Sequence, residues 1–201
     1  MTSLLDAERK FALPATLQEQ MYVIPGHAKP LVLLHLLYNL SLRKVLCFTK
    51  SVEASNRLVQ LLSFFADEYI SPSVTRVEAA NYSSDLSPSK RKEVVDRFVK
   101  GEIGVLVCSD LVARGMDIAG VEHVVNYDAP IDMRKYVHRV GRTARAGKEG
   151  QAWSLVETQE ANAFKNMLKE AGRYEAVKKL KIKEAETEPF NEAYEVRRSY
   201  M

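Results

Sequence analysis

Three stretches of this 201-residue sequence place charged and hydroxyl side chains where they could bind phosphate. The first, CFTKS (47–51), ends an apolar run and brings Thr49, Lys50 and Ser51 to the start of a predicted helix. Hydroxyls, an ammonium group and the free amides of a helix N-terminus together favour an anion. Taken alone, the stretch is explained more simply as an ordinary helix cap beside a solvated lysine.

The second stretch, CSDLVARGMD (108–117), also follows an apolar run. Ser109 lies at the predicted strand end, and Arg114, Gly115 and Asp117 follow within one loop. Glycine allows backbone amides to approach a ligand, arginine can grip phosphate with two donors, and a carboxylate can accept from a ribose hydroxyl. A loop held together by an Asp–Arg pair explains the stretch equally well.

The third stretch, YVHRVGRTARAGKEG (136–150), carries arginines at three-residue intervals: Arg139, Arg142 and Arg145. On a continuous helix His138, Arg142 and Arg145 would lie within roughly 60° of one another. Glycine and alanine in this stretch predict that the helix ends before Arg145. Arginines aimed at a cleft can stabilise the charge that develops during phosphoryl transfer.

A solvated basic helix is the usual explanation of such a run of charge. The small residues between the arginines, Gly141, Ala144 and Gly147, weaken that explanation because a solvated face does not need them. Gly141 to Lys148 is not a Walker A loop, since five residues separate the two glycines and Glu149 stands where Ser or Thr is required. The chain therefore has candidate arginine fingers without a nucleotide cradle, as expected of one half of a two-part ATPase.

The elements around these stretches predict an α/β domain with a mainly parallel sheet. Short β-branched runs alternate with helical patterns, and both faces of the sheet are expected to be covered. The predicted strands lie within 44–49, 73–80, 103–109, 121–128 and 151–157, and the predicted helices within 29–40, 51–69, 87–101, 131–142 and 158–172. For the helix within 87–101 we expect Ser87 as the N-cap, Pro88 at the first helical position and Gly101 as the C-terminal stop. Ligands gather at the carboxyl ends of parallel strands, and all three stretches are expected to follow such ends.

Composition limits the remaining possibilities. The net charge of +3 identifies no partner, and two cysteines in apolar runs, Cys47 and Cys108, are expected to be buried reduced thiols. We expect no metal site and no membrane span, and we expect a reducing compartment. Residues 1–20 are interpreted as a linker, 21–172 as the domain, and 173–201 as a charged C-terminal extension.

In order and context, the three stretches resemble motifs IV, V and VI of the second RecA-like domain of DEAD-box ATP-dependent RNA helicases. The resemblance covers about residues 21–172 and implies a three-layer RecA-like fold. It implies that Arg142 and Arg145 are arginine fingers for the γ-phosphate and that His138 links the two helicase domains. It also implies ATP contacts and RNA contacts at two further sets of residues: Gly115 and Asp117 for ATP, and Thr49, Lys50, Arg91, Ser109 and Arg114 for RNA.

The sequence departs from the family at three positions. Pro88 stands where a glutamine is usual, which puts one RNA contact in doubt, while Ser109 replaces threonine and Ala144 replaces glycine. The stretches also resemble the branch that acts in assembly of the large ribosomal subunit, which implies a nucleolar location and assembly-factor partners. The first RecA-like domain, which holds most of the ATP and Mg²⁺ contacts, is absent, so we expect an excised fragment that is inactive alone. A non-catalytic RNA-binding or docking module is the alternative, and a different superfamily-2 helicase that acts on DNA is a third possibility.

Overall fold

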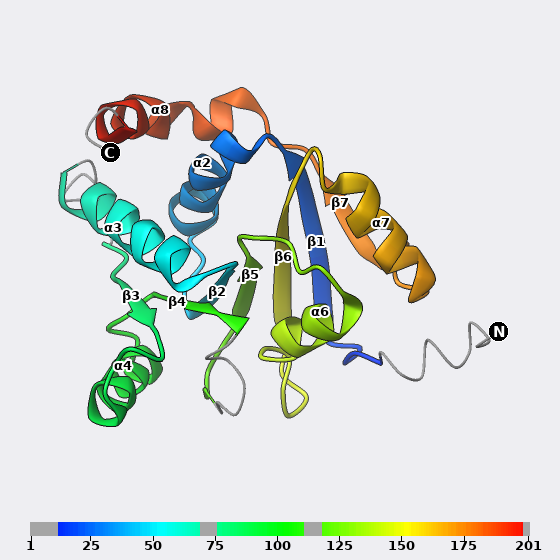
Figure 1. The fold of residues 1–201 in the computed structure, drawn as a ribbon, viewed down its shortest axis with the longest axis horizontal. Coiled ribbons are helices and arrows are strands. Elements are labelled where there is room, and N and C mark those ends of the chain that lie inside the picture. The colour runs from blue at the N-terminus through cyan, green and yellow to red at the C-terminus, as the bar shows by residue number, and fades with distance from the viewer. Residues whose placement is uncertain (1–11, 69–75, 111–117, 199–201) are drawn as a thin grey trace.

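The structure, a computed structural model, describes residues 12–68, 76–110 and 118–198. The described residues form one parallel sheet with strand order β3-β4-β2-β5-β6-β1-β7 (Figure 1). The strands are β1 (Leu17–Ile24), β2 (Val45–Thr49), β3 (Ala79–Tyr82), β4 (Val105–Ser109), β5 (His123–Asn126), β6 (Gly150–Glu157) and β7 (Val177–Leu180). The helices are η1 (Gly26–Ala28), α2 (Lys29–Leu34), η2 (His35–Asn39), α3 (Val52–Glu68), α4 (Pro88–Lys100), α6 (Met133–Val140), α7 (Ala161–Glu170) and α8 (Glu184–Arg198).

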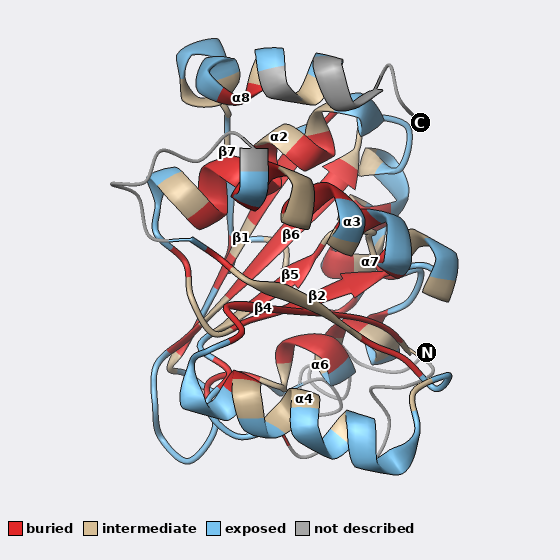
Figure 2. Ribbon diagram, turned by 90° about the vertical axis from the view of Figure 1, so that its left-hand side faces the viewer, coloured by how far each residue is buried: buried red, intermediate tan, exposed pale blue. Residues whose placement is uncertain are grey.

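Helices cover both faces of the sheet, which confirms the predicted three-layer arrangement. Helices α2, α3 and α8 pack on one face, where Cys47, Val107 and Leu155 contribute to a continuous apolar cluster. Helices α4, α6 and α7 cover the other face through two clusters. Figure 2 shows the buried strands between these layers. Strands β2 and β4 are buried along their whole length because both of their faces are covered.

Local signals explain where α4 begins and ends. The Ser87 hydroxyl accepts from the amide of Lys90, Pro88 occupies the first turn, and Gly101 closes the helix with a left-handed φ of 84°. Each feature matches the sequence prediction, because proline needs no amide partner at that position and glycine carries no Cβ penalty there. Ser51 caps α3 in the same way, accepting from the amide of Ala54.

The sheet extends past both ends of the predicted domain. Residues 17–20, expected in a linker, belong to β1, which lies between β6 and β7. The C-terminal extension contributes β7 to the sheet, and α8 packs against α2 and α3 with Phe190 buried in the core. Strand β3 begins at Ala79, so it overlaps only the end of its predicted range. Among the described residues, no helix is long and apolar enough to span a membrane.

Candidate functional site

Strands β2 and β4 bring the first two stretches together. They are neighbours in the sheet, run parallel, and place Thr49 directly opposite Ser109. After each of these strands the chain leaves the sheet at the same edge, formed by the carboxyl ends of the strands, which is where parallel α/β sheets bind ligands. The sequence prediction that these stretches share one edge is confirmed.

A pocket of about 360 Å³ opens at this edge. It is lined by residues from the ends of β2 and β4 and from the starts of α3 and α6: Lys50, Ser51, Val52, Glu53, Ser109, Asp110 and Lys135. Ser109 is 4% exposed, and its hydroxyl oxygen has no hydrogen-bond partner within the described structure. A buried hydroxyl without a partner is unusual and favours a ligand that supplies one. Hydroxyl, ammonium and carboxylate groups in one pocket suit a sugar-phosphate, which offers both hydroxyls and anionic oxygens.

Lys50 is held in place by a carboxylate from the neighbouring strand. Asp128, just after β5, accepts from the Lys50 backbone amide at 2.8 Å. The same carboxylate pairs with Lys29, a buried lysine that also reaches Glu157 at 3.1 Å. A buried ammonium group needs such partners, because removing its charge from water is otherwise costly. The turn that carries Lys50 is therefore fixed to two other strand ends.

Thr49 has a different environment from its neighbour. Its side chain is fully buried, and its hydroxyl bonds the Ser55 hydroxyl at 2.6 Å and donates to the Ser51 carbonyl at 3.0 Å. The predicted RNA contact of Thr49 would therefore have to come from its backbone or from a rearranged side chain. In the described structure the hydroxyl stabilises the first turn of α3.

Arg139 is the residue whose role the sequence did not reveal. It is buried at 3% exposure and pairs with Asp110 through two nitrogens, at 2.6 and 2.9 Å. It also donates to the Asp128 carbonyl at 2.7 Å and lies 5.2 Å from the Phe48 ring centroid. One guanidinium thus joins α6 to the ends of β2, β4 and β5. The only sequence signal was its place in a regular series of arginines, which does not distinguish a buried side chain from an exposed one.

Helix α6 ends earlier than the even spacing of the arginines implies. It stops at Val140, so Arg142 and Arg145 lie on the turns that follow, and the helical projection does not apply to them. Arg142 Nε donates to the His138 carbonyl at 3.3 Å, and Arg145 Nε donates to the Gly141 carbonyl at 2.9 Å. His138 and Arg145 are exposed and Arg142 is half-buried. These bonds direct both guanidinium groups back along the end of the helix.

The turns after α6, residues 141–149, form what we call the finger loop, and buried contacts fix it. The Thr143 hydroxyl lies 2.9 and 2.8 Å from the carbonyls of Val121 and Glu122, just before β5. Ala144 is buried with φ of 55°, a conformation that favours glycine, the usual residue of the family at this position. A Cβ on Gly150 would lie 2.3 Å from Thr143 Oγ1, so only glycine fits there. The small residues therefore serve the shape of the loop.

The remaining predicted site residues divide into two groups. Arg91 lies on the first turns of α4, and its charge acts on Tyr82 at the end of β3. Burial raises the pKa of Tyr82, and the Arg91 charge opposes that rise. Arg91 thus lies beyond β4 at the same sheet edge, outside the lining of the Ser109 pocket. The second group, Arg114, Gly115 and Asp117, lies outside the described residues.

Neither cysteine has the features of a reactive thiol. Cys47 and Cys108 are both buried and unpaired, and burial raises the pKa of Cys108 to about 12. A thiol with so high a pKa stays protonated near neutral pH and is a poor nucleophile. Within the described residues, no three His, Cys, Asp or Glu side chains are grouped as metal ligands.

The helicase conserved C-terminal domain family matches residues 28–147, more than half of the chain. The chain belongs to this family. The ATP-dependent RNA helicase dbp6 of Schizosaccharomyces pombe is 44% identical over 173 residues, which are 86% of this chain and 28% of that protein. The chain spans about a quarter to a third of the length of such curated relatives.

Two solved structures show the same fold. Dbp5 of S. cerevisiae, bound to RNA and ADP BeF3, is 25% identical with a TM-score of 0.67, over 92% of this chain and 46% of that chain. Domain 2 of the DEAD-box helicase Mss116p, bound to an RNA duplex, is 27% identical with a TM-score of 0.65, over 84% and 66% of the two chains. The predicted RecA-like fold and the resemblance to the second domain of DEAD-box helicases are thereby confirmed.

Proposed function

We propose that this domain is the half of an RNA-dependent ATPase that supplies arginine fingers and grips the RNA backbone. The observation that carries the proposal is the combination of a fixed finger loop with a sugar-phosphate pocket on one domain. Arg139 connects the two, because it lies on α6, the helix that precedes the finger loop, and its side chain pairs with Asp110 in the pocket wall. The solved relatives bound to RNA support this interpretation.

The RNA would be held by its backbone. Lys50 and Lys135 would attract phosphate oxygens, and the Ser109 hydroxyl would bond a phosphate or a 2′-hydroxyl. Arg91 and Arg114 would extend the contacts along the strand. Such contacts are largely independent of base identity, so we expect weak binding that falls steeply with salt.

The residues of the finger loop suit a nucleotide phosphate. Arg142 and Arg145 carry planar guanidinium groups on an anchored loop, which is the chemistry that stabilises charge on a γ-phosphate during transfer. We assign Gly115 and Asp117 to the same nucleotide contact and His138 to the link with the ATPase residues of a first RecA-like domain, which would hold Mg²⁺ and most of the triphosphate. ATP supplies the phosphoryl group; this chain supplies positioned positive charge when the two domains close, and reopening after hydrolysis releases the RNA.

We also propose that the intact protein acts in assembly of the large ribosomal subunit, in the nucleolus, with ribosome assembly factors as partners. The similarity to dbp6 and to human DDX51, which is 44% identical over 81% of this chain, supports this branch. Labelling the intact protein in cells and purifying pre-ribosomal particles with it would test both the location and the partners.

The decisive experiment measures ATP hydrolysis with single-stranded RNA. The intact parent protein, its Arg142→Ala variant and this chain alone would be compared, with Arg134→Ala as the matched control. Arg134 is an exposed arginine on α6, the helix that precedes the finger loop. We expect RNA-stimulated turnover in the parent and the control, a loss of about 10³-fold in the finger variant, and no activity in this chain. Unchanged turnover in Arg142→Ala would contradict the finger assignment and favour a non-catalytic RNA-binding module.

A further inference from the structure

A second cationic surface lies on the edge of the sheet that is formed by α7 and β7. Three lysines surround the ring of Tyr174: the Nζ atoms of Lys165 and Lys169 each lie 5.6 Å from its centroid, and that of Lys179 lies 3.7 Å away. We call these four residues the Tyr174 cluster. Cation–π contacts of this length are attractive. They bring three like charges around one aromatic side chain at the protein surface.

The charge of the surrounding segment is concentrated. Residues 161–183 contain six lysines, one arginine and two glutamates, so their net charge is +5, against +3 for the whole chain. The arginine, Arg173, is turned inward to Glu19. Of the glutamates, Glu175 contacts Lys179 at 3.7 Å, and its side chain is 89% exposed. An ion pair so open to water neutralises little of the field around it.

The charges of the three ammonium groups around the Tyr174 ring add up to a local positive potential, which attracts an anion. Lys178, Lys181 and Lys183 extend the positive charge along β7 and the chain that follows it, and all three are exposed. A row of separate cations along an edge matches a ligand with separate, repeated negative charges. From this juxtaposition of the Tyr174 cluster and the lysines of β7, we propose a second RNA-backbone binding surface on the α7–β7 edge.

A protein partner is the less favoured occupant. Protein–protein interfaces have an apolar core, often built around aromatic or large aliphatic anchors. The described large apolar side chains that are exposed are Val23, Leu40, Val99 and Ile131, and none belongs to residues 161–183. Tyr174 itself is only half-exposed and is already covered by lysines. Charge without an apolar anchor favours a nucleic acid.

The surface is separate from the site already described. Strand β7 lies at the opposite edge of the sheet from β3, four strand spacings from β2, which is about 19 Å. In Figure 1, α7 and β7 lie at the right of the molecule, away from α3 and α4. The segment also lies outside residues 28–147, the part that matches the helicase family. The inference thus goes beyond the proposed function, although it shares the assumption that RNA is the ligand.

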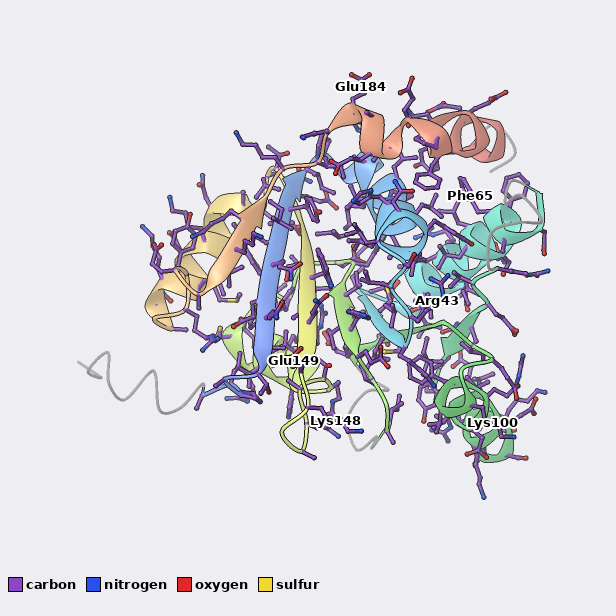
Figure 3. The ribbon with its side chains drawn as sticks, turned by 180° about the vertical axis from the view of Figure 1, so that it is seen from behind. Arg43, Phe65, Lys100, Lys148, Glu149 and Glu184 are labelled. Atoms are coloured by element: carbon purple, nitrogen blue, oxygen red, sulfur yellow. The ribbon has the colours of Figure 1, made fainter. Side chains whose placement is uncertain are left out.

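The test is RNA binding by this 201-residue chain, measured by fluorescence anisotropy over a range of salt concentrations. The probes are labelled uridine RNAs of about 6 and about 20 nucleotides; at about 3.4 Å per stacked nucleotide, only the longer one reaches from β2 to β7 with length to spare. The patch variant is Lys169→Gln/Lys179→Gln. The matched control is Lys92→Gln/Lys100→Gln, which removes two exposed lysines of α4. Figure 3 labels Lys100 and shows it away from α7 and β7.

We expect the patch variant to bind the long RNA about tenfold more weakly and to reduce the salt slope by about 1.4, while the short RNA is bound as before. The control should change neither affinity by more than about twofold. Tyr174→Leu should weaken binding of the long RNA without any change of charge. Tyr174→Phe should bind the long RNA as the wild type does, because its ring still organises the lysines.

Three results would overturn the proposal. The first is an equal loss in the patch and control variants, which would indicate net charge alone. The second is unchanged binding of the long RNA by the patch variant. The third is that the patch variant loses binding to polyglutamate but not to the long RNA, which would assign the surface to an acidic protein. None of these results depends on ATP turnover, so failure of the arginine-finger proposal would be seen separately, in the Arg142→Ala assay of the parent protein.

Discussion

Thr49 and Ser109 lie opposite each other at the ends of the neighbouring buried strands β2 and β4, yet their hydroxyls have different environments. The Thr49 hydroxyl is bonded within the protein, whereas that of Ser109 lines a pocket and has no described partner. The family resemblance assigns both residues to RNA. Their environments separate a hydroxyl that stabilises the fold from one that is available to a ligand.

A pair of substitutions tests this difference. We expect Thr49→Val to lower the free energy of unfolding by about 1–2 kcal/mol, because it leaves buried partners unsatisfied. Ser109→Ala should change stability by less than about 0.5 kcal/mol and should weaken RNA binding. Urea unfolding and RNA anisotropy on both variants would check this. The opposite pattern, with Ser109→Ala unstable and RNA binding intact, would refute it.

The Arg139 guanidinium is expected to contribute to the stability of the domain. Replacing Arg139 with lysine keeps a charge but loses the two-nitrogen grip on Asp110 and the contact with Phe48. Since Arg139 is buried and Asp110 is partly exposed, we expect a loss of about 2–4 kcal/mol in the free energy of unfolding. Chemical denaturation of the lysine variant is the measurement. A loss below about 1 kcal/mol would mean that the guanidinium does not join the three strand ends energetically.

At the scale of elements, the finger loop depends on one close approach. A methyl group on Gly150 would lie 2.3 Å from Thr143 Oγ1 and 2.4 Å from the Ala144 amide nitrogen, so the loop or β6 would have to move. We expect Gly150→Ala to destabilise the domain by about 2 kcal/mol or more. In the intact parent protein, the same change should reduce ATP turnover at temperatures where the variant is still folded. Normal turnover would indicate that the arginines do not depend on this anchor.

How far the sequence predicted each element depended on how local its signals are. The caps of α4 and the buried strand β2 were predicted because serine, proline, glycine and an apolar run each act within a few residues. Strand β1 was missed because residues 1–20 contain a proline and show no strong hydrophobic periodicity, and Glu19 within the strand is a charged residue. The structure buries this glutamate against the Tyr136 hydroxyl at 2.6 Å and against Arg173, both distant in sequence. Distant partners of that kind cannot be read from the strand itself.

The same reasoning applies to the candidate site. Of the residues that line the pocket, Lys50 and Ser109 were named from the motif spacings, whereas Lys135 was not. The geometry was not predicted: the end of α6 before Arg142, the inward Thr49 hydroxyl and the burial of Arg139 all depend on contacts between elements. Tertiary packing decides which of several similar polar side chains faces the ligand.

At the scale of the whole molecule, stability should depend on pH through His123 at the start of β5. Burial lowers the pKa of His123 below its ordinary 6.5, only partly offset by Glu122 and Gln151. The unfolded chain therefore takes up this proton at a higher pH than the folded chain does. Its contribution to stability is complete above about pH 6.5 and is lost as the pH falls through the folded pKa.

Thermal unfolding at about pH 7.5 and about pH 5.5 would check this, with His123→Gln as the comparison. We expect the wild-type domain to lose more stability between these two pH values than the variant does. An identical pH dependence in both proteins would show that His123 does not contribute to it.

The position of β1 also governs when the domain can fold during synthesis. This strand is made first, yet its neighbours are β6 and β7, whose residues are added more than 120 positions later. On the ribosome, residues 17–24 must wait without their partners until residues 150–180 have left the exit tunnel. Pairings between such distant segments are slow to form, and an unpaired strand is prone to associate with other chains. During synthesis there is thus a long interval in which the central strands have been made but the sheet cannot be completed. We expect chaperones to act in that interval.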